Sequence, residues 1–395
     1  MGTEARAQVL VIGAGPVGLM TALQLKRHSV DVKIIDHAEP SSAKSPAVVL
    51  HPRTVEMLAE FGLGEPLRWQ GHSFDHIEVF ANREKAARLT LPVDGEFAKG
   101  ALTLPQNVLR AALEGALRAI GVEVEYGLRF THADQRPNEV VSWLTLHPKS
   151  GSGLVPPTAP TDAPRVVSKF VVGADGFRST VRDRLGIACA LTGEDRPFAF
   201  FDVPQPAHAR ATAELALAEY SSALIPLRGG SSRYIFELPS WPTPSLGAQE
   251  LGELRRARMP WHPTYLDGVE WSGVRSFQPG IAERFGHGRI WLVGDACHVA
   301  NPIGAQSMNV GFREARDLAE AIIDCLNGGK LEHLASGYAE QRRLEWHRLL
   351  ALGQKSLGVR TPAWALRYFA QLISSLPASR DDLDDLLEQL GISML

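Results

Sequence analysis

The segment VLVIGAGPVGLMTALQL, residues 9–25, decides the fold of this chain. Residues 8–12, QVLVI, form the short apolar run of a buried strand, and residues 17–27 carry apolar side chains at helical spacing. The run VDVKIID, residues 30–36, predicts a second strand. A strand, a glycine-rich turn, a helix and another strand predict a βαβ unit, and therefore an α/β fold.

The glycines between the first strand and the helix have the GxGxxG spacing of a Rossmann-like dinucleotide site. Gly13 permits the tight turn, Gly15 lets the backbone approach a pyrophosphate, and Gly18 lets the helix pack on the strand. The start of the helix, at Pro16, favours the anion. Asp36 ends the second strand and is expected to accept hydrogen bonds from the adenosine ribose. Both NAD and FAD fit this pattern.

Two further stretches distinguish between these cofactors. They are RIWLVGDACHVANPIGAQSMNVG at 289–311 and FVVGADGFRSTVR at 170–182. Together with the glycine turn they resemble the three signatures of the FAD-dependent aromatic hydroxylases, the p-hydroxybenzoate hydroxylase family of single-component flavoprotein monooxygenases. The resemblance implies that the strand-Gly-Asp segment meets the ribityl chain of FAD, and that the loop and helix after it face the flavin.

The resemblance also implies a set of FAD-binding residues. Asp295 is expected to accept hydrogen bonds from the ribityl hydroxyls, and the amide of Asn309 to pair with the pyrimidine edge of the flavin. A surface role is an equal alternative for Arg53 and for Gln106. The full set is Gly13, Gly15, Pro16, Gly18, Asp36, Arg53, Gln106, Asp175, Gly294, Asp295, Pro302, Gly304, Ala305, Gln306, Ser307, Met308 and Asn309.

The chain departs from the family in two places. Where many relatives have an arginine in a Pro-Arg-Ala stretch against the flavin, residues 45–47 read Ser-Pro-Ala, with Lys44 beside them. A common Gly-Gly-Gln-Gly-Met-Asn appears as Gly-Ala-Gln-Ser-Met-Asn at 304–309, which adds two Cβ atoms near the ring. The first departure is expected to affect flavin movement or gating by the pyridine nucleotide.

The reaction implied by the resemblance is hydroxylation of a small phenolic or heteroaromatic molecule, with a role in secondary metabolism. NADPH or NADH reduces the flavin, O2 adds to give a C4a-hydroperoxide, and its distal oxygen passes to an electron-rich ring carbon. Such a site needs a closed apolar pocket, for which FAFFDV at 198–203 and SALIPL at 222–227 are candidate walls. The sequence identifies no catalytic base. The pocket candidates are Arg233, Tyr220, Tyr234, His72, His298 and Pro302.

Other reactions on the same fold stay open. Epoxidation, Baeyer-Villiger oxygen insertion and reduction share the same FAD signatures and differ only in the shape of the pocket. Halogenation is less favoured, because the chain lacks the WxWxIP stretch of flavin halogenases. The non-catalytic alternative is a flavin-binding sensor, which would leave the second sheet without a use.

Three units are expected in the chain. A discontinuous Rossmann-like FAD-binding domain takes residues 1–73, 103–190 and 276–350. An inserted mixed β-sheet domain for the substrate takes residues 74–102 and 191–275, and a C-terminal helical segment takes residues 351–395. The Pro- and Gly-rich stretch at 148–164 is interpreted as a mobile hairpin loop.

The composition favours a globular chain that binds small molecules. Among its 395 residues, 41 Lys and Arg against 44 Asp and Glu give a formal charge of −3. No broad positive field is therefore expected to attract nucleic acid or an anionic membrane. Three scattered cysteines suit reduced thiols in the cytoplasm, and no metal, signal peptide or transmembrane segment is expected. Monomer and homodimer both stay open.

Overall fold

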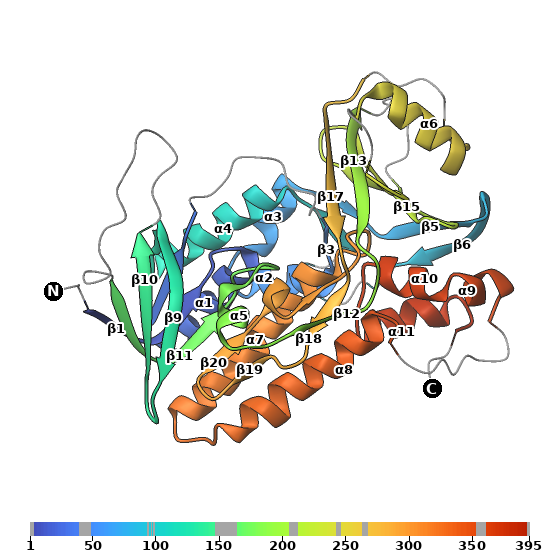
Figure 1. The fold of residues 1–395 in the computed structure, drawn as a ribbon. Helices are drawn as coiled ribbons and strands as arrows, with labels where there is room; N and C mark the ends of the chain where they lie inside the picture. Colours follow the sequence, from blue (N-terminus) through green and yellow to red (C-terminus); the bar gives the residue numbers. More distant parts are fainter. Residues whose placement is uncertain are drawn as a thin grey trace.

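Two large sheets organise the chain in the computed structural model (Figure 1). One has eight strands and the other seven. The structure describes residues 4–38, 49–92, 95, 97, 99–146, 164–204, 212–241, 246–262, 268–352 and 361–392. Residues 44–47 and 148–163, on which the first family departure and the loop prediction fall, lie outside the described residues.

The eight-stranded sheet is built around the strand that precedes the glycine turn. In this sheet β1 pairs in parallel with β2 and with β11, and β11 pairs in parallel with β20. Val9, Leu10 and Val11 of β1 are fully buried, as expected for a central parallel strand. The strands are β1 (Glu4–Ile12), β2 (Val32–Asp36), β8 (Val124–Tyr126), β9 (Leu128–Gln135), β10 (Val140–Leu146), β11 (Arg165–Gly173), β19 (Gly286–His287) and β20 (Ile290–Leu292).

Helices pack beside this sheet and bring distant segments together. Helix α1, Pro16–Arg27, starts at the glycine turn and packs against both α4, Gln106–Ala119, and α7, Gln306–Leu326. The short helix α5, Thr180–Arg184, follows β11. Because α7 lies against α1, the signature segment at 289–311 lies next to the glycine turn at the start of the chain (Figure 1).

The sequence of residues 47–62 favours a single helix, but the helix starts later than this pattern predicts. Residues Val49–Leu50 form β3, which pairs with β7, and α2 spans only Pro52–Ala59. A proline disfavours helical backbone at the residue before it. His51, which precedes Pro52, is accordingly extended, with ψ of 155°. The other elements of this region are α3 (Gly64–Gln70), β4 (His72–Phe74) and β7 (Ala101–Thr103).

The seven-stranded sheet has two different faces. Its order is β17-β13-β16-β15-β14-β5-β6. One face forms a separate small core with α6, Ala248–Arg258, in which Tyr234 and Phe236 are buried (Figure 1). The strands are β5 (His76–Ala81), β6 (Glu84–Thr90), β13 (Arg196–Pro204), β14 (Ala213–Leu217), β15 (Ser222–Leu227), β16 (Ser231–Glu237) and β17 (Trp271–Phe277).

A third, three-stranded sheet links the two large ones. Its strands are β12 (Cys189–Leu191), β18 (Gly280–Ala282) and β21 (His298–Val299). Since β21 directly follows the Gly-Asp turn, a short 3-10 helix at Gly294–Ala296, this sheet fixes that turn next to the second large sheet.

The C-terminal part is helical, with one correction. The sequence favours one long helix from Tyr338 to Leu357, but the helix begins earlier, as a π-helix at Leu334–Ala339, and continues as α8, Glu340–Leu349. It stops there because Ala351 has a positive φ of 54°, which a helix does not accommodate. The later helices are α9 (Ala363–Arg367), α10 (Phe369–Ser375) and α11 (Asp381–Glu388).

The predicted division into domains stays a prediction, although the sheets follow it closely. The eight-stranded sheet takes its strands from the ranges expected for the FAD-binding domain. The seven-stranded sheet takes its strands from the expected substrate domain, except that β17 extends two residues past 275. In the described part of the chain, no helix combines the length and the apolar character needed to cross a bilayer.

Candidate functional site

The three glycines of the first turn meet different surroundings. A Cβ on Gly13 would lie 2.3 Å from the carbonyl oxygen of Ala174, and φ at Gly13 is +106°. A Cβ on Gly18 would lie 2.0 Å from the carbonyl oxygen of Gly13. At Gly15, by contrast, an added Cβ would meet no atom within 4 Å. The first and third glycines are therefore needed for packing inside the protein, and the second leaves room for a ligand.

A cavity of about 600 Å³ opens beside this turn. Asp36 at the end of β2 lines it, and its carboxylate accepts a hydrogen bond from the Ala14 N–H at 2.7 Å. The N-terminus of α1 carries a partial positive charge next to Gly15, so the cavity suits a phosphate. Two cations that the sequence analysis did not single out, Arg129 and Arg178, also line it.

Replacing the glycines one at a time separates their roles. In Gly15→Ala we expect FAD affinity to fall at least tenfold while the stability of the FAD-free protein is unchanged, because the new methyl group enters only the cavity. In Gly18→Ala we expect a loss of about 1–3 kcal/mol of unfolding free energy, because α1 must move off the turn. Urea unfolding and fluorescence titration with FAD measure the two effects. Equal stability loss in both variants would contradict these roles.

The third signature also borders this cavity, through Asp175. The Asp175 carboxylate accepts hydrogen bonds from the Ser179 hydroxyl and from the Val181 N–H, so it caps the start of α5. Burial raises the pKa of Asp175, and these hydrogen bonds partly oppose that increase. Asp175 therefore forms part of the cavity wall while its carboxylate holds the start of α5 in place.

Asp295, in the Gly-Asp turn, has its side chain in a second cavity. It is the one exposed residue between Ile290 and Ala300, because the space it reaches is this cavity. The surrounding protein still raises the pKa of the Asp295 carboxyl by desolvation; nearby His298 lowers it and Glu314 raises it further. A carboxylate held in this way gains from ligand hydroxyl groups that donate hydrogen bonds to it.

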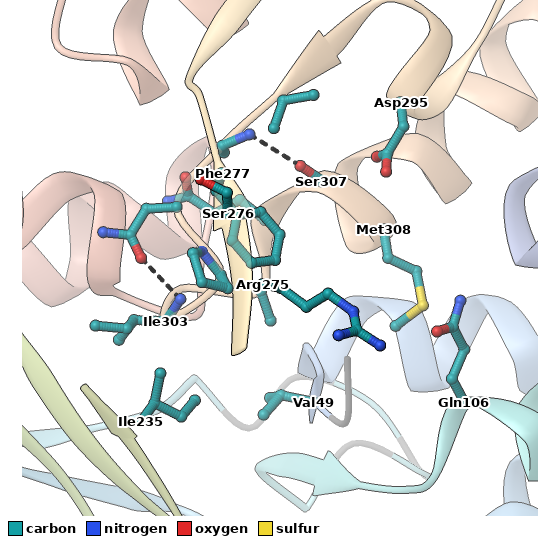
Figure 2. Close-up of a pocket in the computed structure, with 16 residues that line it drawn as sticks. Val49, Gln106, Ile235, Arg275, Ser276, Phe277, Asp295, Ile303, Ser307 and Met308 are labelled. Atoms are coloured by element: carbon teal, nitrogen blue, oxygen red, sulfur yellow. Dashed lines mark hydrogen bonds between the residues drawn. The ribbon is translucent and has the colours of Figure 1, made fainter. Parts of the chain in front are cut away.

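The second cavity measures about 340 Å³ and has two kinds of wall (Figure 2). The wall from the eight-stranded sheet and its helices carries Asp295, Met308 and Gln106. The opposite wall comes from the seven-stranded sheet and includes Ile235 and Phe277. Residues predicted to bind FAD that line this cavity are Gln106, Asp295, Pro302, Ala305, Gln306, Ser307 and Met308.

Val17 at the start of α1 packs against the Gly-Asp turn and α7. Added Cβ atoms on Gly294 and Gly311 would lie 3.1 Å and 2.7 Å from methyl groups of Val17. Arg182, from the third signature, donates to the carbonyl oxygen of Ala296 at 3.1 Å. The three signature segments, far apart in the sequence, therefore lie side by side, as one ligand spanning both cavities requires.

A buried carboxylate that the sequence analysis missed supports the Gly-Asp turn. Glu314 of α7 accepts hydrogen bonds from the Gly294 N–H at 2.9 Å, the His298 ring at 2.8 Å and the Trp346 indole N–H at 2.7 Å. Burial alone would raise the pKa of Glu314, but the neighbouring His298 and the three donors outweigh it and keep the pKa below its usual value. Glu314 thus holds the backbone of the turn in place.

The C-terminal helices hold the loop before α7. The Gln306 amide donates to the carbonyl oxygens of Ile373 and Leu376. A Cβ on Gly304 would lie 2.5 Å from the Ser374 carbonyl oxygen, so the loop sits directly on α10. Ala305 caps α7 with a positive φ of 50°, where the family commonly has glycine.

The amide of Asn309 is engaged within the protein. Its oxygen accepts from the His51 N–H at 2.8 Å, and its nitrogen donates to the carbonyl oxygens of Val49 and Ala305. Pairing with a flavin through this amide would require one of these bonds to break. The His51 ring is buried and lies 2.9 Å from the Gly304 carbonyl oxygen. Burial lowers the pKa of His51 to about 3, so the ring is neutral and donates to that oxygen.

Five of the six pocket candidates are absent from the lining of the second cavity. Arg233 is buried in a bidentate ion pair with Asp202, because a guanidinium inside a sheet needs a carboxylate partner. Tyr234, next to it on β16, belongs to the core on the α6 side of the sheet. His298 is bonded to Glu314 and stacked on Trp346 behind the Gly-Asp turn.

The other two candidates also lie outside the second cavity. Tyr220 stacks with Arg196 and Arg258 at the end of β14. His72 sits at the start of β4, where its carbonyl oxygen accepts from the Thr103 hydroxyl, and burial lowers the pKa of its ring. Pro302 alone among the six lines the cavity.

Arg53 lies away from both cavities among the described residues. Its guanidinium donates to Asp382 of α11 at 2.8 Å and lies 3.8 Å from Asp381. The FAD contact implied for Arg53 therefore has no support in these contacts. No group of three metal-binding side chains occurs in the described part of the chain.

The glycine turn lies at the first cavity, and the Gly-Asp turn faces the seven-stranded sheet across the second. This arrangement defines a flavin-dependent class of dinucleotide-binding proteins. The model of the FAD binding domain family matches residues 6–351. The chain therefore belongs to this FAD-binding family, which confirms the predicted cofactor FAD, and relatives named as monooxygenases support the predicted resemblance to the FAD-dependent aromatic hydroxylases.

Relatives of known name agree with this assignment. The chain is 30% identical over 362 residues to 6-methylpretetramide 4-monooxygenase of Streptomyces rimosus, with 87% of this chain and 60% of that protein covered. It is 27% identical over 346 residues to para-nitrophenol 4-monooxygenase of Pseudomonas sp. strain WBC-3, with 85% and 82% covered. It is also 28% identical over 352 residues to dialkyldecalin synthase of Streptomyces rugosporus, with 87% and 71% covered.

The fold matches a solved structure over its whole length. The crystal structure of p-nitrophenol 4-monooxygenase PnpA from Pseudomonas putida DLL-E4 has a TM-score of 0.74 at 22% identity, and both chains are covered completely. This likeness confirms the predicted α/β fold with a mixed second sheet and C-terminal helices.

Proposed function

We propose that this chain is an FAD-dependent monooxygenase that uses NADH or NADPH and O2 to hydroxylate a small aromatic molecule. One observation carries the proposal: the Asp295 carboxylate and the apolar face of the seven-stranded sheet share one cavity. The cofactor side and the candidate substrate side therefore face each other across a short space (Figure 2).

The residues present fit FAD. Gly15 leaves open space at the N-terminus of α1, and Asp36 lies at the same cavity. In the second cavity Asp295 offers an acceptor for ribityl hydroxyls, and the first turn of α7 offers backbone N–H groups for the polar edge of a flavin. When bound, FAD takes two electrons from NAD(P)H and transfers one oxygen atom of O2 to the ring, the other leaving as water.

The chain itself contributes binding, orientation and exclusion of water. Phe277, Ile235 and Ile303 supply apolar surface on the substrate side, which protects an oxygen-transfer step from solvent. Pro302, which has no backbone N–H, keeps the loop stiff beside the reacting ring. None of the described side chains in this cavity is a histidine or tyrosine, so a base for the phenol is not assigned.

A second candidate function is a reaction that transfers no oxygen. Dialkyldecalin synthase is named for forming a ring system, and its similarity to this chain favours keeping this candidate. Epoxidation, Baeyer-Villiger insertion and double-bond reduction are further alternatives, because they would use the same cofactor side of the cavity. A flavin-binding sensor without turnover is the remaining alternative.

Labelled dioxygen distinguishes oxygen transfer from the functions that transfer no oxygen. The FAD-loaded protein is incubated with NADPH or NADH, a panel of phenols and heteroaromatics, and isotopically labelled O2. We expect a ligand that accelerates NAD(P)H oxidation and gains one labelled oxygen atom on a ring carbon. A protein that binds FAD tightly but neither oxidises NAD(P)H faster with any ligand nor labels one would reject the monooxygenase and favour the second candidate.

We further propose that the protein acts in the cytoplasm as a monomer or homodimer. All three cysteines, Cys189, Cys297 and Cys325, are free thiols, which suits a reducing compartment. Size-exclusion chromatography with light scattering determines the oligomeric state, and a larger assembly would contradict this part of the proposal.

A further inference from the structure

A third cavity, of about 260 Å³, adjoins the second one. In the part of the chain that the structure describes, Phe277 and Asn301 line both cavities, so these two residues form the boundary between them. The other walls of the third cavity include Phe198 of β13 and Ala370 of α10. The substrate side of the second cavity therefore ends where a further space begins.

The sheet register explains why Phe277 stands at this boundary. Phe277 is the last residue of β17 and projects from the same face as Arg275, two residues earlier. Phe198 and Ile235 lie on the same face of the neighbouring strands. Arg275 and Ile235 line the second cavity, whereas Phe198 lines the third. The ring of Phe277 therefore lies where one space gives way to the other.

The two sides of the boundary are held differently. The Asn301 side-chain oxygen accepts a hydrogen bond from the Ile303 N–H at 2.8 Å (Figure 2), and Pro302 lies between these residues. This turn and its proline fix the loop. The half-buried ring of Phe277 makes edge contacts with two aromatic rings of β13, with centroid distances of 5.7 Å and 6.5 Å. A smaller side chain at position 277 therefore opens the boundary while the loop keeps its place.

The third cavity offers room for an uncharged group. Its charged side chains are engaged within the protein, since Glu194 pairs with Arg196 and Glu237 accepts from a backbone N–H. Thr192 and Ser374 add uncharged polar groups to the lining. Apolar surface comes from Phe198, Pro279, Leu350 and Ala370. A second ring of a ligand would gain contact there if it passed the boundary.

We propose that Phe277 sets the length of the aromatic molecule that the protein accepts, because its ring separates the second cavity from the third. This inference rests on the proposed function for the aromatic nature of the substrate, but the binding it describes needs no turnover. The unmodified protein selects short aromatics, which fit between the cofactor side and Phe277. Elongated aromatics are rejected, because their second ring meets Phe277.

Pairs of short and elongated phenols test the inference without catalysis. The FAD-loaded protein, with no NAD(P)H present, is titrated by calorimetry with phenol and 4-phenylphenol, and with 2-naphthol and 6-phenyl-2-naphthol. In at least one pair we expect the unmodified protein to bind the short member tenfold or more tightly. In Phe277→Ala the affinity for the elongated member should rise ten- to a hundredfold, the range for burying one aromatic ring, while that for the short member does not rise.

Two further variants make the test specific. Phe277→Leu keeps an apolar side chain that packs on β13 and should show a smaller gain, which keeps the test decisive if the alanine variant fails to fold. Leu350→Ala is the matched control, because Leu350 lines the third cavity but not the second. It enlarges that space behind a closed boundary, so the ratio of the two affinities should stay within twofold. The flavin-to-protein ratio should be the same in all four proteins.

Two results would overturn the inference. One is the absence of any pair in which the unmodified protein prefers the short member. The other is a preference for the short member that neither replacement of Phe277 reduces. Hydroxylation of elongated aromatics by the unmodified protein would leave the proposed function standing and reject only the length limit. Preference for the short members without labelling of any ring would reject the proposed function and leave the role of Phe277 in binding.

Discussion

Replacing Asp295 with asparagine is expected to lower FAD affinity at least tenfold and, at the same time, to stabilise the FAD-free protein. The first effect follows from the loss of a charged acceptor for the ligand hydroxyls, since hydrogen bonds to charged groups contribute about 1.5–3 kcal/mol each. The second follows from desolvation by the cavity walls around this side chain, which raises the pKa of the Asp295 carboxyl and so makes its ionised form costly in the folded state.

The raised pKa of Asp295 determines how the stability of the FAD-free protein changes with pH. A carboxyl with a raised pKa binds its proton more tightly when folded, so stability falls as the pH rises above the ordinary carboxyl value of about 3.9. At neutral pH the asparagine variant without FAD should therefore unfold at a higher urea concentration than the unmodified protein. The FAD affinity of the unmodified protein should weaken as the pH is lowered through the raised pKa.

Arg53→Ala is the control for Asp295. Because Arg53 pairs with Asp382 on the far side of α2, this variant should keep its FAD. Fluorescence titration with FAD and urea unfolding of the FAD-free proteins give both readouts. Equal retention of FAD by the two variants would refute the placement of the ribityl chain at Asp295.

Removing the Glu314 carboxylate is expected to be the most destabilising single change near the site. In Glu314→Ala three buried donors, from Gly294, His298 and Trp346, lose their acceptor. Breaking a buried, hydrogen-bonded charge of this kind costs about 3–5 kcal/mol. Glu314→Gln keeps the shape and one acceptor oxygen, so we expect a smaller loss and a soluble protein in which FAD affinity is measurable and reduced.

Acid should remove the difference between the unmodified protein and Glu314→Gln. A carboxyl with a lowered pKa contributes its stability above the ordinary glutamate value of about 4.3, and loses it as the pH falls through the lower folded value. Glu320→Gln, an exposed position on the same helix, should change unfolding by less than about 0.5 kcal/mol. Urea unfolding between neutral and acid pH measures all three, and a Glu314→Ala protein as stable as Glu320→Gln would contradict the role assigned to Glu314.

The turns were predictable from the sequence because their requirements are local. Gly13 needs a positive φ of +106°, and a Cβ on Gly18 would meet the carbonyl oxygen of Gly13 only five residues earlier, so both positions are visible as glycines at fixed spacing. The Gly-Asp turn is recognised in the same way. By contrast, the two-residue strand at Val49–Leu50 depends on pairing with β7, some fifty residues later, and no local sequence pattern predicts it.

Long polar side chains were the least predictable part of the site. Arg233 and Arg275 project from the same face of the same sheet, the face that carries Ile235, so alternation alone does not say which of the two reaches the cavity. The structure gives Arg233 a carboxylate partner on β13 and leaves Arg275 with a cavity. Likewise, the sequence shows Glu314 only as an acidic residue on an amphipathic helix. Tertiary packing brings three hydrogen-bond donors to it.

The contact of Val17 with Gly294 and Gly311 has a consequence for biosynthesis of the protein. As the chain emerges from the ribosome, the glycine turn is made first, but the residues that complete its surroundings follow almost three hundred residues later. Until α7 has been translated, an emerging chain has the nucleotide signature without the second half of its binding site. We therefore expect uptake of the cofactor to be a late event, and a prematurely terminated chain to expose the surface of α1 that packs on α7.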